Sequence, residues 1–207
     1  MIATRPRPKP RQKPAGAPRT KPAEVRLDEL MNAAQRLFLE KGVESTTVSE
    51  IVEEAQVAKG TFYTYFASKN DMLVALGERY TQHFLQALEQ AIEQCAKDDW
   101  VSRLRVWVHA NVATYLATYS IHDIVYTNHH HHDRNNKAKN AILDQLMVIL
   151  EGGKAAGVWQ LSDPRINALM IYSGVHGVTD DAIVDRLEDC TAFADKVSVS
   201  CLAMLGR

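Results

Sequence analysis

The stretch from Thr46 to Lys69 concentrates side chains that can contact a polyanion. Its lysines carry ammonium groups suited to phosphate oxygens, and its hydroxyl side chains can donate hydrogen bonds to phosphates or reach base edges and thymine methyl groups. The chemistry that this stretch indicates is nucleic-acid binding. We expect phosphate contacts from Lys59, Lys69, Thr47, Tyr63 and Tyr65, and base contacts from Thr61 and Thr64.

Four consecutive histidines, His129 to His132, form a second unusual cluster. Adjacent side chains on a helix diverge, and only positions three or four residues apart share a face. His129 with His132, or His129 with Asp133, therefore supplies at most two metal ligands, and a closed site needs more. We predict no metal ion and no cofactor. An effector contact, a pH-sensitive role and a solvated helix N-terminus remain open for the cluster.

Capping residues predict that the stretch from Thr46 to Lys69 forms two short helices joined by a tight turn. Thr47 followed by Glu50 is a capping box, which predicts a helix start. Lys59 opens the second helix, which carries four aromatic residues. Ser68 with Asp71 forms a similar box and begins the next helix, so the aromatic helix has about two turns. A short, partly exposed helix of this kind suits a nucleic-acid groove.

The run VAKGTFYTYFASK at residues 57–69, followed by Leu73, carries a family resemblance. Residues 24–73 resemble the N-terminal DNA-binding domain of TetR-type transcriptional regulators. The resemblance implies a helix-turn-helix in which Gly60 lets the backbone approach DNA closely, while Phe62 and Phe66 lie in the core. It also implies a homodimer and an effector-binding C-terminal domain.

Composition divides the chain into three parts. Residues 1–22 hold six of the seven prolines and seven basic residues without an acid, and the remainder has 17 basic against 25 acidic residues. We predict a flexible basic arm at 1–22, a helix-turn-helix domain at 23–69 and a helical effector-binding and dimerisation domain at 70–207. The arm either contacts DNA or is a solvated extension.

Apolar spacing of three and four residues predicts an all-α fold. The first helix begins near Ala23 and ends before Gly42, and a long fourth helix begins at Ser68 and can transmit a displacement to the DNA-binding domain. Further helices are expected at about 100–119, 138–156, from Pro164, and at 183–204. A separate short apolar piece is expected at 121–126.

The central helices are expected to enclose a ligand cavity. We predict that a small apolar or aromatic effector binds there and lowers the affinity for DNA. Large aromatic side chains suit such a cavity, and a few polar groups from the same helix are candidates beside them. The expected lining residues are Trp107, Tyr115 and Tyr126, and the polar candidates are His109, Asn111 and Thr114.

The final predicted helix carries a seam spaced alternately by four and three residues. Small residues in the middle of the seam allow close helix approach, and we expect a dimer interface here. An intramolecular core is the alternative. The interface residues are predicted to be Ile183, Leu187, Cys190, Ala194, Val197 and Cys201.

Other features bear on the class of protein. Three cysteines without metal-binding spacing fit a reducing cytoplasm, and no run approaches the roughly 18 apolar residues of a membrane span. The sequence contains no nucleophile elbow, phosphate-binding glycine loop or zinc-protease motif, so an enzyme has little support. The prediction is a cytoplasmic, homodimeric repressor that binds a palindromic operator, with a helical interaction or scaffold module as the alternative.

Overall fold

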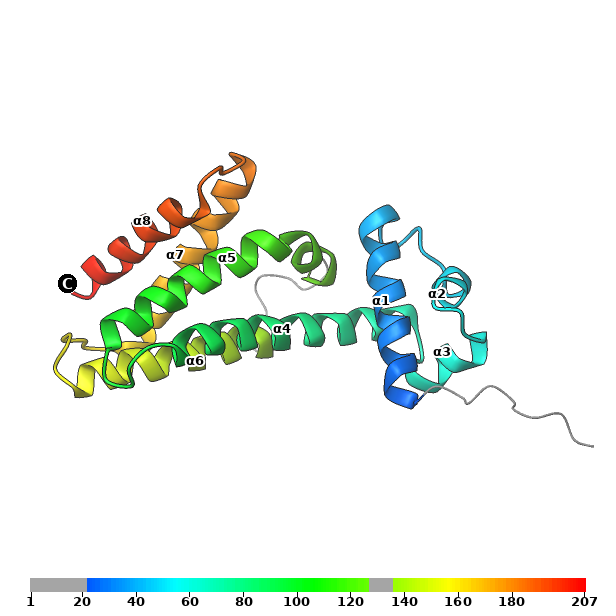
Figure 1. The fold of residues 1–207 in the computed structure, drawn as a ribbon, viewed down its shortest axis with the longest axis horizontal. Coiled ribbons are helices and arrows are strands. Elements are labelled where there is room, and N and C mark those ends of the chain that lie inside the picture. The colour runs from blue at the N-terminus through cyan, green and yellow to red at the C-terminus, as the bar shows by residue number, and fades with distance from the viewer. Residues whose placement is uncertain (1–21, 127–135) are drawn as a thin grey trace, which may run out of the picture.

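The computed structural model describes residues 22–126 and 136–207, and all regular elements in these two ranges are α-helices (Figure 1). The predicted all-α fold is confirmed. The predicted arm at 1–22, apart from Pro22, and the histidines at 129–132 lie outside the described residues. The helices are α1 Ala23–Lys41, α2 Val48–Glu54, α3 Lys59–Tyr65, α4 Lys69–Glu93, α5 Trp100–Tyr126, α6 Lys137–Ala155, α7 Pro164–Val184 and α8 Cys190–Met204.

Polar side chains start the helices where the sequence predicts. The Thr47 hydroxyl accepts a hydrogen bond from the Glu50 backbone N–H at 3.3 Å, and the Glu50 carboxylate accepts one from the Thr47 N–H at 2.8 Å. Lys41 on α1 also pairs with Glu50, and this ion pair is the main reason that the pKa of Glu50 falls to about 2. Ser68 caps α4, and Asp163 caps α7 with Pro164 at its first position.

Helices α1 to α3 form a small bundle around one hydrophobic core. Phe62 of α3 is fully buried, and Phe66 is nearly so. The core also takes Met72 and Leu76 from the start of α4, and Val125 from the end of α5. The bundle therefore packs on two helices of the larger domain.

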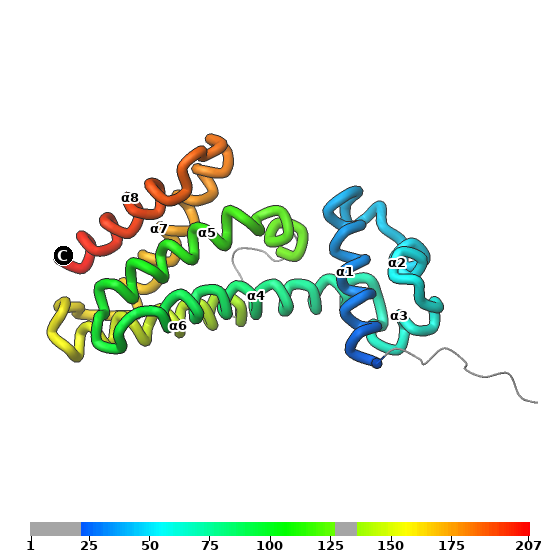
Figure 2. Tube along the Cα trace, in the orientation of Figure 1, coloured from blue at the N-terminus to red at the C-terminus, as the bar shows by residue number. Residues whose placement is uncertain are grey.

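Helix α4 joins the two parts of the molecule (Figure 2). Its 25 residues give a length of roughly 38 Å at about 1.5 Å per residue. Met72 near its start lies in the N-terminal core, and Leu88 and Ile92 near its end lie in the C-terminal core. Helix α4 therefore contributes to both hydrophobic cores.

Helix α5 is longer than predicted. The expected end near Tyr119 and the separate apolar piece at 121–126 are wrong, because α5 continues without a break to Tyr126. The interval contains no proline or glycine that would stop a helix. The additional turns are held by burial of Val125 in the N-terminal core.

The structure divides the last predicted helix, at 183–204, between two helices. Residues 185–189 separate α7 from α8, with Arg186 at a φ of 55° and Asp189 capping α8 through the Ala192 N–H. Ile183 therefore belongs to α7, and Leu187 lies between the helices. The predicted single helix at 183–204 is wrong, since its apolar spacing runs across a turn that has no glycine or proline.

Two adjacent glycines let large indole rings pack against α6. A Cβ atom at Gly152 would lie 2.2 Å from the Trp100 ring, and one at Gly153 would lie 2.1 Å from the Trp159 ring. Trp159 is buried, and its Nε1 donates to the Leu150 carbonyl at 2.8 Å. The two glycines thus allow both indole rings to lie directly against the α6 backbone.

We predict that Gly153→Ala lowers the free energy of unfolding by about 1–3 kcal/mol, because the added methyl group overpacks the Trp159 site. Gly60→Ala is the matched control, since nothing lies within 4 Å of its added Cβ. Thermal unfolding at equal protein concentration measures both. Equal midpoints for the two variants would contradict the packing described.

Candidate nucleic-acid interface and ligand pocket

Helix α3 presents a polar face to solvent while its other face is buried. Phe62 is fully buried, whereas Tyr63 is 54% exposed, and their rings meet edge to face at 5.4 Å between centroids. Lys59, Gly60 and Thr64 are exposed as well. The burial of Phe62 therefore fixes which side chains of α3 face outward.

The start of α2 lies beside α3. The Lys59 ammonium donates a hydrogen bond to the Ser49 hydroxyl of α2 at 3.3 Å, and both groups are exposed. Thr47, two residues earlier, is exposed but uses its hydroxyl in the capping box. The N-terminus of α2 and the exposed face of α3 thus share one polar surface.

Lys69 has a structural position that the sequence prediction missed. Its ammonium donates to the backbone carbonyls of Val43 at 2.5 Å, Thr46 at 3.0 Å and Glu44 at 3.4 Å. These carbonyls belong to the loop between α1 and α2, and they have no helical partner. Lys69 stabilises this loop, and its phosphate contact stays a prediction.

Two other predicted contact residues also make internal hydrogen bonds. The Tyr65 hydroxyl donates to the Ala23 carbonyl at 2.9 Å, which fastens the start of α1 to the end of α3. The Thr64 hydroxyl donates to the Gly60 carbonyl at 3.1 Å and remains exposed. Thr61 is partly buried. The most accessible predicted contacts are therefore Thr47, Lys59, Gly60, Tyr63 and Thr64.

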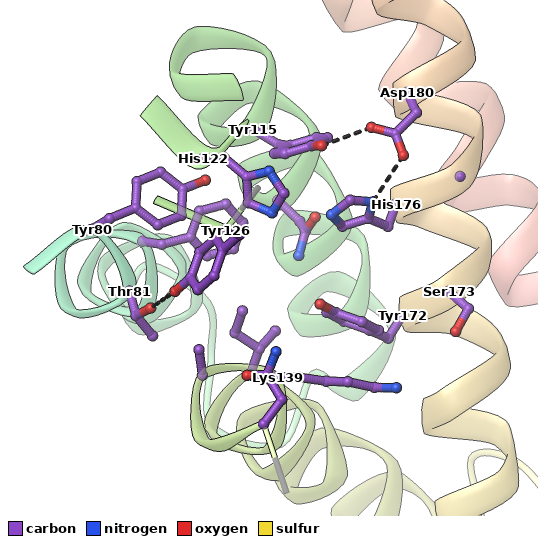
Figure 3. Close-up of a pocket in the computed structure, with 16 residues that line it drawn as sticks. Tyr80, Thr81, Tyr115, His122, Tyr126, Lys139, Tyr172, Ser173, His176 and Asp180 are labelled. Atoms are coloured by element: carbon purple, nitrogen blue, oxygen red, sulfur yellow. Dashed lines mark hydrogen bonds and ion pairs between the residues drawn. The ribbon is translucent and has the colours of Figure 1, made fainter. Parts of the chain in front are cut away.

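A cavity of about 320 Å³ lies between α4, α5, α6 and α7 (Figure 3). Seven of its 16 lining residues carry aromatic or imidazole rings, and polar groups project from α5, α6 and α7. Tyr115 and Tyr126 line it as predicted, together with the polar candidate Asn111. The aromatic lining residues that the sequence analysis did not identify are Tyr80, Phe84, His122, Tyr172 and His176.

One wall of the cavity is a hydrogen-bonded group from α5 and α7. The Tyr115 hydroxyl donates to Asp180 Oδ1 at 2.7 Å, and Asp180 Oδ2 lies 3.1 Å from His176 Nδ1. Burial and the neighbouring carboxylate raise the pKa of Tyr115. Burial also raises the pKa of Tyr172 to about 12. These phenols stay protonated at neutral pH and remain hydrogen-bond donors.

The opposite wall ties α5 to α4. The Tyr126 and Thr81 hydroxyl oxygens lie 2.5 Å apart, and the Tyr126 hydroxyl also donates to the Gly77 carbonyl at 3.3 Å. His122, one turn earlier on α5, meets the Tyr115 ring edge to face at 5.0 Å between centroids. Burial lowers the pKa of His122, so its ring is neutral at pH 7.

Trp107, in contrast to Tyr115 and Tyr126, does not line this cavity. Its side chain is fully buried in the core, and its Nε1 donates to Gln145 Oε1 at 3.2 Å. Buried Trp107 and the lining residue Tyr115 have the same helical spacing on α5. The sequence alone therefore does not distinguish a core aromatic residue from one that lines a cavity. A repeat of Tyr172, His176 and Asp180 at intervals of four residues on α7 was the available signal for the missed wall.

The predicted dimer seam divides between the core and the surface. Ala194 and Cys201 are buried in the chain's own core, where α8 packs on α5, so the intramolecular alternative holds for these two residues. Cys190 and Val197 are partly buried. Within the described ranges, no three potential ligand residues are placed to hold a metal ion, and none of the helices is long and apolar enough to cross a membrane.

We predict that Lys69→Met lowers the free energy of unfolding by about 1–3 kcal/mol, because the Val43 and Thr46 carbonyls lose a charged donor. Lys59→Met is the matched control, since the Lys59 ammonium contacts only the exposed Ser49 hydroxyl among the described residues. Thermal unfolding should show a lower midpoint for Lys69→Met alone. An unchanged midpoint would mean that Lys69 does not stabilise the loop.

Known bacterial regulators resemble this chain in sequence and in fold, and the matched sequence includes α3. The family profile described as "Bacterial regulatory proteins, tetR family" matches residues 30–76. The transcriptional regulator AcuR of Cereibacter sphaeroides is 42% identical over 84 residues, which cover 40% of this chain and 37% of AcuR. The match with AcuR thus spans little more than a third of that protein.

Two similarities extend over most of the chain. The fatty acid metabolism regulator protein of Bacillus subtilis is 26% identical over 174 residues, covering 82% of this chain and 90% of the relative. The solved structure of the regulator FadR from Bacillus subtilis in complex with stearoyl-CoA aligns with a TM-score of 0.69 and 21% identity, covering 84% of this chain and 96% of that one. Residues 30–76 of this chain thus match the tetR family of bacterial regulatory proteins, and the fold of the whole described chain resembles that of solved regulators.

Proposed function

We propose that the protein is a homodimeric, DNA-binding transcriptional repressor that leaves its operator when a small molecule binds the central cavity. The observation that carries this proposal is the exposed polar face of α3, held outward by the fully buried Phe62. The likeness to regulators over most of the chain supports it. The cavity supplies a place for a ligand on the same polypeptide.

The α3 surface suits the major groove of DNA. Lys59 and Tyr63 are exposed and can contact phosphates, and Thr64 is small enough to reach base edges. The Tyr65 hydrogen bond to Ala23 places the point where residues 1–22 join α1 beside α3. In this proposal the basic arm reaches phosphates or the minor groove next to the site that α3 occupies.

Dimerisation uses the outer faces of α7 and α8. Several large apolar side chains are exposed there, and an added Cβ atom at Gly174 would meet only open space, so a partner helix can approach closely. The exposed residues are Ile166, Met170, Val178, Val199 and Met204. A two-fold dimer would present two α3 helices to half-sites about 34–36 Å apart, which a palindromic operator provides.

The end of α5 gives the ligand a route to the DNA-binding bundle. Tyr126 lines the cavity, and the adjacent Val125 is buried in the N-terminal core, 3.7 Å from the position of a Cβ at Gly77. Arg79 of α4 also donates to Asn32 and Gln35 of α1, at 2.9 Å and 2.8 Å. A ligand that prefers a different α4 and α5 arrangement changes the spacing of the two α3 helices.

This release depends on unequal affinity of the ligand for the two arrangements. A ligand that binds both equally shifts nothing, however tightly it binds. Conversion from almost fully bound to almost fully free protein needs about 5.5 kcal/mol of differential affinity. The ligand must therefore contact side chains that move with the bundle, and Tyr126 satisfies that requirement.

We predict that Lys59→Ala weakens binding to DNA from the protein's own promoter region and reduces the slope of log K against log salt by about 2 per dimer, because each subunit loses one phosphate contact. Fluorescence anisotropy at several salt concentrations measures the slope. Lys97→Ala is the control, because Lys97 is exposed between α4 and α5, at the far end of α4 from the bundle.

The wild-type protein should bind this DNA selectively in the presence of unlabelled nonspecific competitor. Absence of selective binding at low salt would contradict the proposed function and favour a helical interaction module. Selective binding with an unchanged salt slope in Lys59→Ala would instead remove Lys59 from the interface.

A further inference from the structure

Flat aromatic and imidazole rings form a large part of the cavity walls. Tyr115 and His176 lie 4.4 Å apart between ring centroids, His122 and Tyr126 lie 5.0 Å apart, and Tyr172 lies 6.1 Å from His176. The contacts are tilted rather than parallel, so the rings present both faces and edges to the space. A planar aromatic ligand can contact such walls by offset stacking and edge-to-face packing.

Size and lining both favour a small, flat ligand over a long acyl chain. The volume of about 320 Å³ lies at the lower end of the roughly 300–1,000 Å³ that is usual for ligand pockets. Among the described lining residues, Ala138 and Ile142 are the only aliphatic ones. An extended alkyl chain would thus find few aliphatic partners here.

The cavity contains two formal charges with different surroundings. Asp180 already accepts a hydrogen bond from Tyr115 and lies against His176, so each of its carboxylate oxygens has a partner within the protein. The Lys139 ammonium lies 5.9 Å from the centre of the Tyr172 ring, and no carboxylate in the described ranges pairs with it. In Figure 3, Lys139 extends beneath Tyr172, away from Asp180.

These surroundings distinguish anionic from cationic ligands. A cation would have to compete with Lys139 for the Tyr172 ring and would be repelled by the ammonium. A carboxylate instead gains a charge-assisted hydrogen bond from an amine that has no anionic partner in the described residues. The protonated hydroxyls of Tyr80 and Tyr172 add neutral donors, because burial raises the pKa of each to about 12.

We propose that the cavity binds a small planar aromatic carboxylate, whose ring packs among Tyr126, Tyr172 and His176 and whose carboxylate accepts a hydrogen bond from Lys139. This inference rests on the proposed function, since it names the chemical class of the ligand that controls DNA binding. It assigns Lys139 as the residue that selects an anion.

Isothermal titration calorimetry of the full-length protein without DNA tests the inference. The probes are 2-naphthoate, its neutral analogue 2-naphthamide, the cation 2-naphthylmethylammonium and the aliphatic acid octanoate. We expect 2-naphthoate to bind most tightly. Lys139→Gln should weaken its binding about tenfold, because a hydrogen bond to a charged group is lost. The same variant should leave the affinity for 2-naphthamide unchanged.

Lys137→Gln is the matched control, because Lys137 precedes Lys139 by two residues, is exposed and does not line the cavity. Its affinity for 2-naphthoate should equal that of the wild type. Circular dichroism establishes that both variants are folded.

Tighter binding of octanoate or of the cation, equal effects of both lysine substitutions, or no binding of any aromatic acid would overturn the proposed ligand class. Selective DNA binding, measured separately without ligand, would still stand in each case. Failure of the ligand assignment is therefore distinguishable from failure of the proposed function.

Discussion

The last turn of α5 is the contact on which the arrangement of the whole molecule depends. Val125 is buried in the core of the N-terminal bundle, while Tyr126 lines the cavity and hydrogen bonds to α4 through Thr81 and Gly77. Neighbouring residues on a helix point in different directions, so one turn can contact both regions. A close-packed core resists small displacements, and in the proposed function a change at Tyr126 is therefore passed to the bundle.

Polar side chains elsewhere in the bundle support the proposed DNA-binding function together with this turn. Arg79 ties the bundle to α4, and Lys69 and Tyr65 hold the bundle's own segments together. Buried Phe62 keeps the exposed face of α3 directed outward. In the proposed dimer, a few degrees of rotation of α4 and α5 alter the distance between the two α3 helices, and the operator has a fixed spacing.

The sequence predicts the parts of the fold that local chemistry controls. Capping at Thr47, Ser68 and Asp163 defines helix starts, because each side chain bonds to its own helix. The length of α5, the break at Arg186 and the positions of Trp107 and Lys69 depend on tertiary packing. Aromatic residues at the same helical spacing can lie in a core or line a cavity. A lysine ammonium can likewise donate to backbone carbonyls or to phosphates. Only the packed chain distinguishes these outcomes.

The operator affinity of Tyr126→Phe tests the coupling through α5 most directly. The substitution keeps the ring but removes the hydroxyl that bonds to Thr81 and Gly77, at a site on the cavity wall. In the proposed function the arrangement described here is the DNA-binding one. Without any ligand, affinity should then fall by about two- to tenfold, because a hydrogen bond that holds this arrangement is lost. Tyr119→Phe, at an exposed position on the same helix, should have no effect. Wild-type affinity in Tyr126→Phe would contradict the account.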